Sequence, residues 1–176
     1  MSEGAGAKEQ AAQTPGANSS AIPESKVFIS YASADKAAAD SIVVALEREG
    51  ISCWIAPRDV TPGAFYADAI VHALSAARLL IVVLSAHSAN SQHVLREVER
   101  ASSKKRPLLV FRLDATPLPA SLEYFLSASH WLDASAGAMG TALPQLVEAV
   151  GKTLALPAPS AARSTDRRNA IVRFLA

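Results

Sequence analysis

The sequence predicts a flavodoxin-like α/β fold of three layers, in which helices cover both faces of a five-stranded parallel sheet of order 2-1-3-4-5. Half of the 176 residues are hydrophobic and 19% are charged, as in a globular domain. Short apolar runs alternate with segments of helical periodicity, which is the pattern of βαβ units. One run, residues 79–84 (LLIVVL), is wholly apolar, as a strand buried on both faces must be.

The first expected strand covers residues 26–31 (KVFISY), and the first helix covers residues 36–49. Asp35 is expected to cap this helix at its start, and Gly50 to end it. Apolar residues recur at helical spacing along it and are expected to face the sheet. These residues are Ala38, Ile42, Ala45 and Leu46.

The second expected strand, residues 51–55 (ISCWI), leads into loop 56–64, which holds two prolines and a glycine. A helix is expected at residues 66–77, before the strand at 79–84. The next helix, residues 91–104, follows that strand. Its predicted apolar face consists of Val94, Leu95, Val98 and Ala101.

The remaining strands are expected at residues 107–113 and 129–132, and the last helix at residues 143–155. Residues 26–156 thus form one predicted domain. A leader at residues 1–25, poor in large apolar side chains, is expected to be disordered. Residues 157–176 resemble a linker. They are either a frayed end or the stretch before a membrane segment or a further domain, and the sequence leaves both open.

Composition and motifs exclude several functions. The net charge of +1 argues against a nucleic-acid-binding domain. One cysteine, Cys53, and four scattered histidines give no zinc-binding spacing, so we expect neither a metal nor a bound cofactor. A single thiol and the absence of a secretory signal favour a cytoplasmic location.

The predicted sheet places the functional site where the strand order reverses, beyond the carboxyl ends of the first and third strands. The loops there begin at Ala32 and Ser85. Neither GxGxxG, GxxxxGK[ST] nor GxSxG occurs in the chain. A phospho-acceptor receiver domain is disfavoured because no acidic pair follows the first strand and no aspartate ends the third.

Four segments resemble parts of one known family. They are the strand FISY, the run CWIAPRDVTPG before a helix, the run LLIVVLS followed by SANSQHVLREVERA, and the late HWLDA. In this order and at these spacings, residues 26–156 resemble a Toll/interleukin-receptor (TIR) domain, most closely its bacterial branch. TIR domains divide into enzymes that cleave NAD and adaptors that only assemble.

The resemblance implies that Glu97 is the catalytic glutamate. The family has an aromatic residue four positions earlier, and this chain has His93 there, on the same helix face. Residue pattern alone favours a different role for Glu97, a solvated ion pair with Arg100 three residues later. Both readings are open at this point.

Further positions follow from the resemblance. The loop after the first strand, with Ala32 and Ser33, contacts the dinucleotide in family enzymes. The loop after the second strand lines the substrate cleft, which implies roles for Thr61 and Phe65. The same loop makes head-to-tail contacts in the family. Its assembly residues would be Arg58, Asp59, Pro62 and Gly63.

The resemblance therefore implies an NAD glycohydrolase that releases nicotinamide and ADP-ribose or a cyclic variant. NAD would be its substrate and self-assembly its activator, with a role in bacterial immunity. One alternative is a non-catalytic adaptor or scaffold that acts through homotypic TIR–TIR contacts. Another is a domain that binds a cyclic ADP-ribose-like signal without cleaving it. No nucleic-acid partner is expected.

Overall fold

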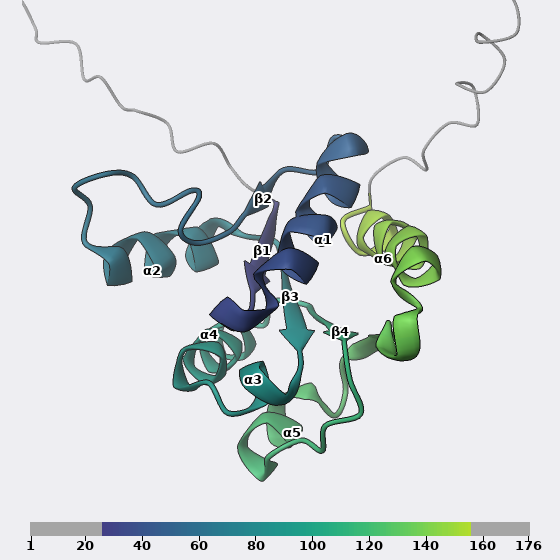
Figure 1. Ribbon diagram of the computed structural model, residues 1–176. Helices are drawn as coiled ribbons and strands as arrows, with labels where there is room; N and C mark the ends of the chain where they lie inside the picture. Colours follow the sequence, from purple (N-terminus) through teal and green to yellow (C-terminus); the bar gives the residue numbers. More distant parts are fainter. Residues whose placement is uncertain (1–25, 156–176) are drawn as a thin grey trace, which may run out of the picture.

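The sheet has the predicted order. In the computed structural model, which describes residues 26–155, five strands pair in parallel in the order β2-β1-β3-β4-β5 (Figure 1). The strands are β1 (Val27–Ser30), β2 (Cys53–Trp54), β3 (Leu79–Leu84), β4 (Leu108–Arg112) and β5 (His130–Asp133). The predictions of a disordered leader and a linker-like tail fall outside the described residues.

Six α-helices and two short 3-10 helices lie between and after the strands of the described part. They are η1 (Ser33–Asp35), α1 (Lys36–Arg48), α2 (Tyr66–Ala76), α3 (Ala86–Ala89), α4 (Gln92–Ser103), α5 (Ala120–Leu126), η2 (Ser135–Gly137) and α6 (Met139–Thr153). Between residues 26 and 155 no helix is long and apolar enough to cross a bilayer.

Three features of the helices differ from the prediction. The α3 helix was not expected, because four residues are too few to show a helical period. The α5 helix, also missed, follows Pro119 and buries Leu122 and Leu126 at i, i+4 spacing. The α6 helix begins a turn earlier than expected. Pro144 lies inside the helix, and Ala142 before it is already helical and buried.

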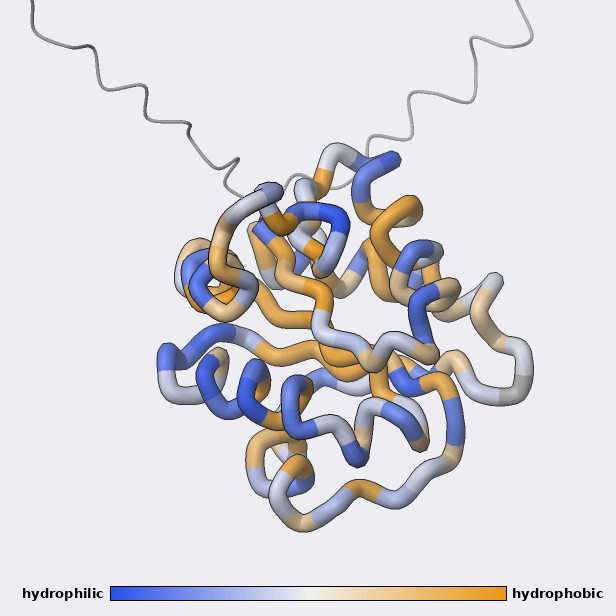
Figure 2. Tube along the Cα trace, turned by 60° about the vertical axis from the view of Figure 1, so that its left-hand side comes forward, coloured by the Kyte–Doolittle hydropathy of each residue, from blue (hydrophilic) through white to orange (hydrophobic). Residues whose placement is uncertain are grey.

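Side chains alternate between the two faces of the sheet, and each face has its own core. The odd-numbered residues of β1, such as Ile29, pack with α1 and α6, whereas Phe28 packs with α2, α4 and α5. Figure 2 shows the apolar strands running through the middle of the domain. Three layers result, as predicted. Trp54 is buried and stacks on Phe28 with ring centroids 4.8 Å apart.

The Asp35 side chain has a role that the prediction missed. Asp35 precedes α1, but its carboxylate makes no capping hydrogen bond there. The short helix η1 turns it toward the end of β3 instead, where it accepts a 2.6 Å hydrogen bond from the Ser85 hydroxyl. Both residues are buried. This bond ties the turn after β1 to the turn after β3, at the point where the strand order reverses.

Burial also explains the chemistry of the single cysteine. Cys53 lies in β2 on the α1 side of the sheet, and its surroundings raise the pKa of the thiol to about 12, chiefly by desolvation. A thiol with this pKa is protonated at neutral pH and is a poor nucleophile. Cys53 is thus a core residue.

Candidate functional site

Glu97 lies where α4 passes the carboxyl end of β1. The apolar residues Val94 and Val98 are fully buried against the sheet and fix the rotation of α4. This rotation leaves Glu97, which lies beside Val94 on the helix surface, half-buried at the edge of the apolar face. The buried Ser30, the last residue of β1, donates a 2.5 Å hydrogen bond from its hydroxyl to Glu97 Oε2.

The surroundings of Glu97 make its carboxyl a weaker acid than an ordinary glutamate. Desolvation raises its pKa from the ordinary 4.5 to about 7, and the hydrogen bond from Ser30 opposes part of this rise. Protonated and ionised forms of Glu97 therefore coexist near neutral pH. Carboxyl groups shifted in this way are common at functional sites, because acid–base and electrostatic catalysis needs groups poised near the working pH.

Glu97 does not form the surface ion pair that residue pattern alone favours. Among the ion pairs found between residues 26 and 155, none joins Glu97 to Arg100. The hydrogen bond that Glu97 does make comes from the sheet, not from its own helix. A solvated helix pair is thus a poor description of this carboxylate.

Glu97 borders a cavity of about 540 Å³ at the predicted position, between the loops that follow β1 and β3. Its volume is within the usual range for small-molecule sites. Polar and aromatic side chains from four segments converge on it. Among its lining residues are Ala32, Ser33, Tyr66, His87, His93 and Glu97.

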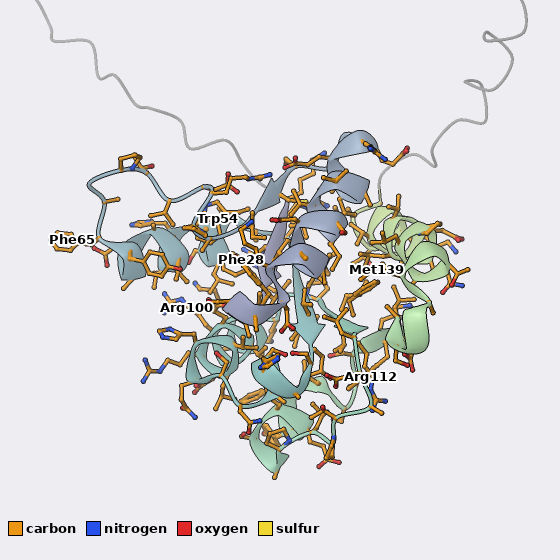
Figure 3. All side chains as sticks on the ribbon, viewed as in Figure 1. Phe28, Trp54, Phe65, Arg100, Arg112 and Met139 are labelled. Atoms are coloured by element: carbon orange, nitrogen blue, oxygen red, sulfur yellow. The ribbon has the colours of Figure 1, made fainter. Side chains whose placement is uncertain are left out.

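The structure brings together four of the six predicted catalytic and substrate-binding residues. Ala32, Ser33, His93 and Glu97 share this cavity. Thr61 and Phe65 do not line it, since both are exposed on the loop after β2. The Phe65 side chain is 82% exposed and points away from the domain (Figure 3).

Arg58 and Asp59, two of the predicted assembly residues, anchor the base of loop 56–64. Arg58 pairs with Glu47 of α1 and with Asp59, and it also donates to the carbonyl of Cys53. The Asp59 carboxylate accepts from the backbone N–H of Ile55 at 2.8 Å. These contacts hold the base of the loop against α1 and β2. The other two predicted assembly residues, Pro62 and Gly63, are exposed at its tip.

Sequence reasoning missed Ser30 and His87 as side chains of the site. Ser30 gave one usable signal, a hydroxyl within an otherwise apolar strand, next to the switch point. Tyr31 lines the cavity, and its hydroxyl donates a 2.6 Å hydrogen bond to the carbonyl of Ala56. This bond joins the loop after β1 to the loop after β2. His87 gave no signal, because α3, which carries it, was not expected.

Replacing Ser30 by alanine should raise the pKa of Glu97 further, by about one unit, since it removes the hydrogen bond that favours the ionised form. The carboxyl ¹³C chemical shift of Glu97, followed against pH by NMR, measures this change. Ser33→Ala, on the exposed neighbouring loop, is the matched control and should leave the titration unchanged. An unaltered midpoint in Ser30→Ala would show that the hydrogen bond does not tune Glu97.

Comparisons with known proteins agree on the fold. The sequence profile of the TIR domain family (TIR_2) matches residues 27–147. The TIR domain of the Toll-related receptor TRR-2 from Hydra magnipapillata is 25% identical, with a TM-score of 0.60 over 71% of this chain and 97% of that one. A flavodoxin-like domain from a Synechococcus species is 15% identical, with a TM-score of 0.50 over 73% and 98% of the two chains.

A longer protein shares the same fold. A metazoan TIR-STING receptor from C. gigas, solved in complex with 2′,3′-cGAMP, is 24% identical, with a TM-score of 0.56 over 71% of this chain. The match spans only 39% of that receptor. No curated protein sequence matches the chain.

Proposed function

The chain belongs to the TIR domain family, and from this premise we propose that it is an NAD glycohydrolase with Glu97 as its catalytic residue. The products are nicotinamide and ADP-ribose or a cyclic variant of ADP-ribose. We further propose that self-assembly activates it. Some TIR domains cleave NAD and others do not, so the proposal depends on what this chain's own residues offer.

One observation carries the proposal: Glu97 is a half-buried carboxyl that opens into a cavity large enough for a small-molecule ligand. The loop after β1, where family enzymes contact the dinucleotide, also lines this cavity. A carboxylate with a purely structural role would be paired with a cation or turned to solvent. Glu97 is instead desolvated and held by one neutral hydroxyl, so its charge is available to a ligand.

The reaction needs few groups. The bond from C1′ of the ribose to the nicotinamide nitrogen breaks, and nicotinamide leaves as a neutral molecule with the bonding electron pair, so no general acid is required. Positive charge develops on the ribose, as in glycoside hydrolysis. The Glu97 carboxylate stabilises that charge in a desolvated site. Water then adds to C1′ and loses its proton to Glu97 or to solvent, or a nucleophile of the ligand itself closes a ring.

Two neighbours assist Glu97 in this proposal. Ser30 fixes the carboxylate by its hydrogen bond and favours the ionised form. His93 lies one helical turn before Glu97 and lines the same cavity. Its imidazole provides a flat ring where the family has an aromatic side chain, and we assign it to packing against the nicotinamide ring.

Incubation of the purified chain with NAD, followed by chromatography for nicotinamide, tests the proposal. We expect nicotinamide to appear, and we expect the rate per subunit to rise between dilute and concentrated protein because assembly activates the enzyme. A Phe65→Ser variant serves as a probe of assembly, since its exposed ring is a candidate contact residue. Absence of nicotinamide at every concentration would contradict the enzymatic proposal.

The exposed aromatic residues favour a second candidate function, that of a non-catalytic adaptor. Phe65 and the half-exposed Tyr66 are adjacent at the start of α2, next to loop 56–64. Exposed aromatic side chains are frequent anchors of protein–protein contacts. Self-association in sedimentation experiments, weakened by Phe65→Ser and unaccompanied by NAD cleavage, is the result that this alternative predicts.

A further inference from the structure

A second cavity adjoins the first between α2 and α4. It has a volume of about 520 Å³. Four residues line both cavities, namely Tyr66, Ile70, His93 and Glu97. The two spaces therefore meet at Glu97, and a ligand whose ribose lies against this carboxyl can extend into either. We call the second cavity the α2–α4 groove.

The two cavities differ in their charged residues. No lysine or arginine lines the first cavity, whose basic residues are His87 and His93. The α2–α4 groove has an apolar wall from α2 and two arginines from α4, Arg96 and Arg100. One further carboxylate, that of the exposed Glu99, also borders the groove. An anionic part of a ligand is therefore better placed in the groove than beside the loop after β1.

Arg100 lacks the partners that its position requires. Three arginines in the described part of the chain are half-buried. Arg106 also has a buried Nε without a partner, but its guanidinium still donates through Nη2 to the carbonyl of Ser75. Arg112 donates through Nε to the carbonyl of Asp114. Arg100 has a buried Nε without a hydrogen-bond partner, and no ion pair in residues 26–155 includes its guanidinium. Figure 3 shows it on the side of the domain where α2 and α4 lie.

A half-buried guanidinium without an acceptor is costly, because it has lost water without gaining a counter-charge. Arginine presents a planar fork of donors that fits phosphate oxygens in pairs. We infer that the α2–α4 groove is a diphosphate subsite, in which Arg100 and the more exposed Arg96 bind the diphosphate of a ligand whose ribose lies at Glu97. This assignment rests on the proposed function and names the chemistry of its substrate, a nucleoside diphosphate.

Calorimetric binding of ADP-ribose and of inorganic pyrophosphate tests the subsite without requiring turnover. Arg100→Gln should weaken ADP-ribose binding by about 10- to 100-fold, the usual effect of losing a hydrogen-bonded charge. Arg48→Gln, which removes an exposed arginine of α1 that lines neither cavity, should bind as the unaltered chain does. Arg96→Gln tests the same groove at an exposed position if Arg100→Gln folds poorly. In NAD cleavage, Arg100→Gln should raise KM more than it lowers kcat.

The outcomes separate this inference from the proposed function. Arg100-dependent ADP-ribose binding in a chain that does not cleave NAD would retain the subsite and overturn the enzymatic proposal. NAD cleavage with unchanged KM in both arginine variants would retain the enzyme and overturn the subsite. Arg100-dependent binding of pyrophosphate, without binding of ADP-ribose, would also overturn it, by showing a site for small phosphate anions alone.

Discussion

Replacing Glu97 by glutamine should lower the rate of NAD cleavage by about 10²- to 10³-fold or more, while the domain remains folded. Glutamine has nearly the same size and keeps an oxygen that accepts the hydrogen bond from Ser30. It cannot carry the negative charge that stabilises the cationic ribose. The variant thus removes the electrostatic contribution and little else. Nicotinamide release at saturating NAD measures the effect.

The matched control for this experiment is Glu123→Gln. Glu123 is an exposed glutamate of α5 that lines neither cavity, so its replacement should leave turnover unchanged. Circular dichroism of both variants checks that the fold is retained. Full NAD cleavage by Glu97→Gln would remove Glu97 from the mechanism, even if the wild-type chain proved to be an NAD glycohydrolase.

The order of the sheet followed from the sequence because its strands are buried on both faces. A run such as Leu79–Leu84 has few alternatives to a central parallel strand, and the glycine at residue 50 marks a helix end unambiguously. The sequence was a weaker guide to which face of a helix is buried against the sheet. Ala38 and Ala45 were expected to face the sheet from α1, but both are only partly buried, Ala38 at the edge of the core, whereas Ala39 and Val43 are buried within it. Helical spacing tolerates a shift of one residue when alanines occupy both candidate faces.

Only two parts of the candidate site could be predicted, namely the position of the cavity at the strand ends and the position of Glu97 on its helix. The switch-point rule placed the cavity, and the resemblance placed Glu97. The partner of Glu97 could not be predicted, because Ser30 is 67 positions away in the chain and only the packing of α4 on β1 brings the two together. The α2–α4 groove that contains Arg100 could not be predicted for the same reason. Its walls come from α2 and α4, and sequence periodicity does not define the separation of two helices.

The stability of the domain should depend on pH through Glu97. Its pKa is about 7 in the folded chain, whereas 4.5 is the ordinary value expected when the chain is unfolded. Below pH 4.5 the group is protonated in both states and has no effect. Between these two values the unfolded chain ionises while the folded chain retains the proton, so the free energy of unfolding decreases as pH rises. Above pH 7 the loss is complete and amounts to about 3 kcal/mol.

Glu97→Gln should therefore stabilise the domain at pH 8 by about 3 kcal/mol relative to the wild-type chain and have little effect at pH 4. Urea unfolding at both pH values measures the difference. Glu99→Gln, at an exposed position on the same helix, should show no such dependence on pH. A stabilisation of equal size at pH 4 and pH 8 would mean that packing, and not a desolvated charge, distinguishes the variant. The expected result is a stabilisation confined to high pH, together with a loss of turnover. It would show that desolvation of the Glu97 carboxylate destabilises the fold and also allows this group to stabilise a cationic transition state.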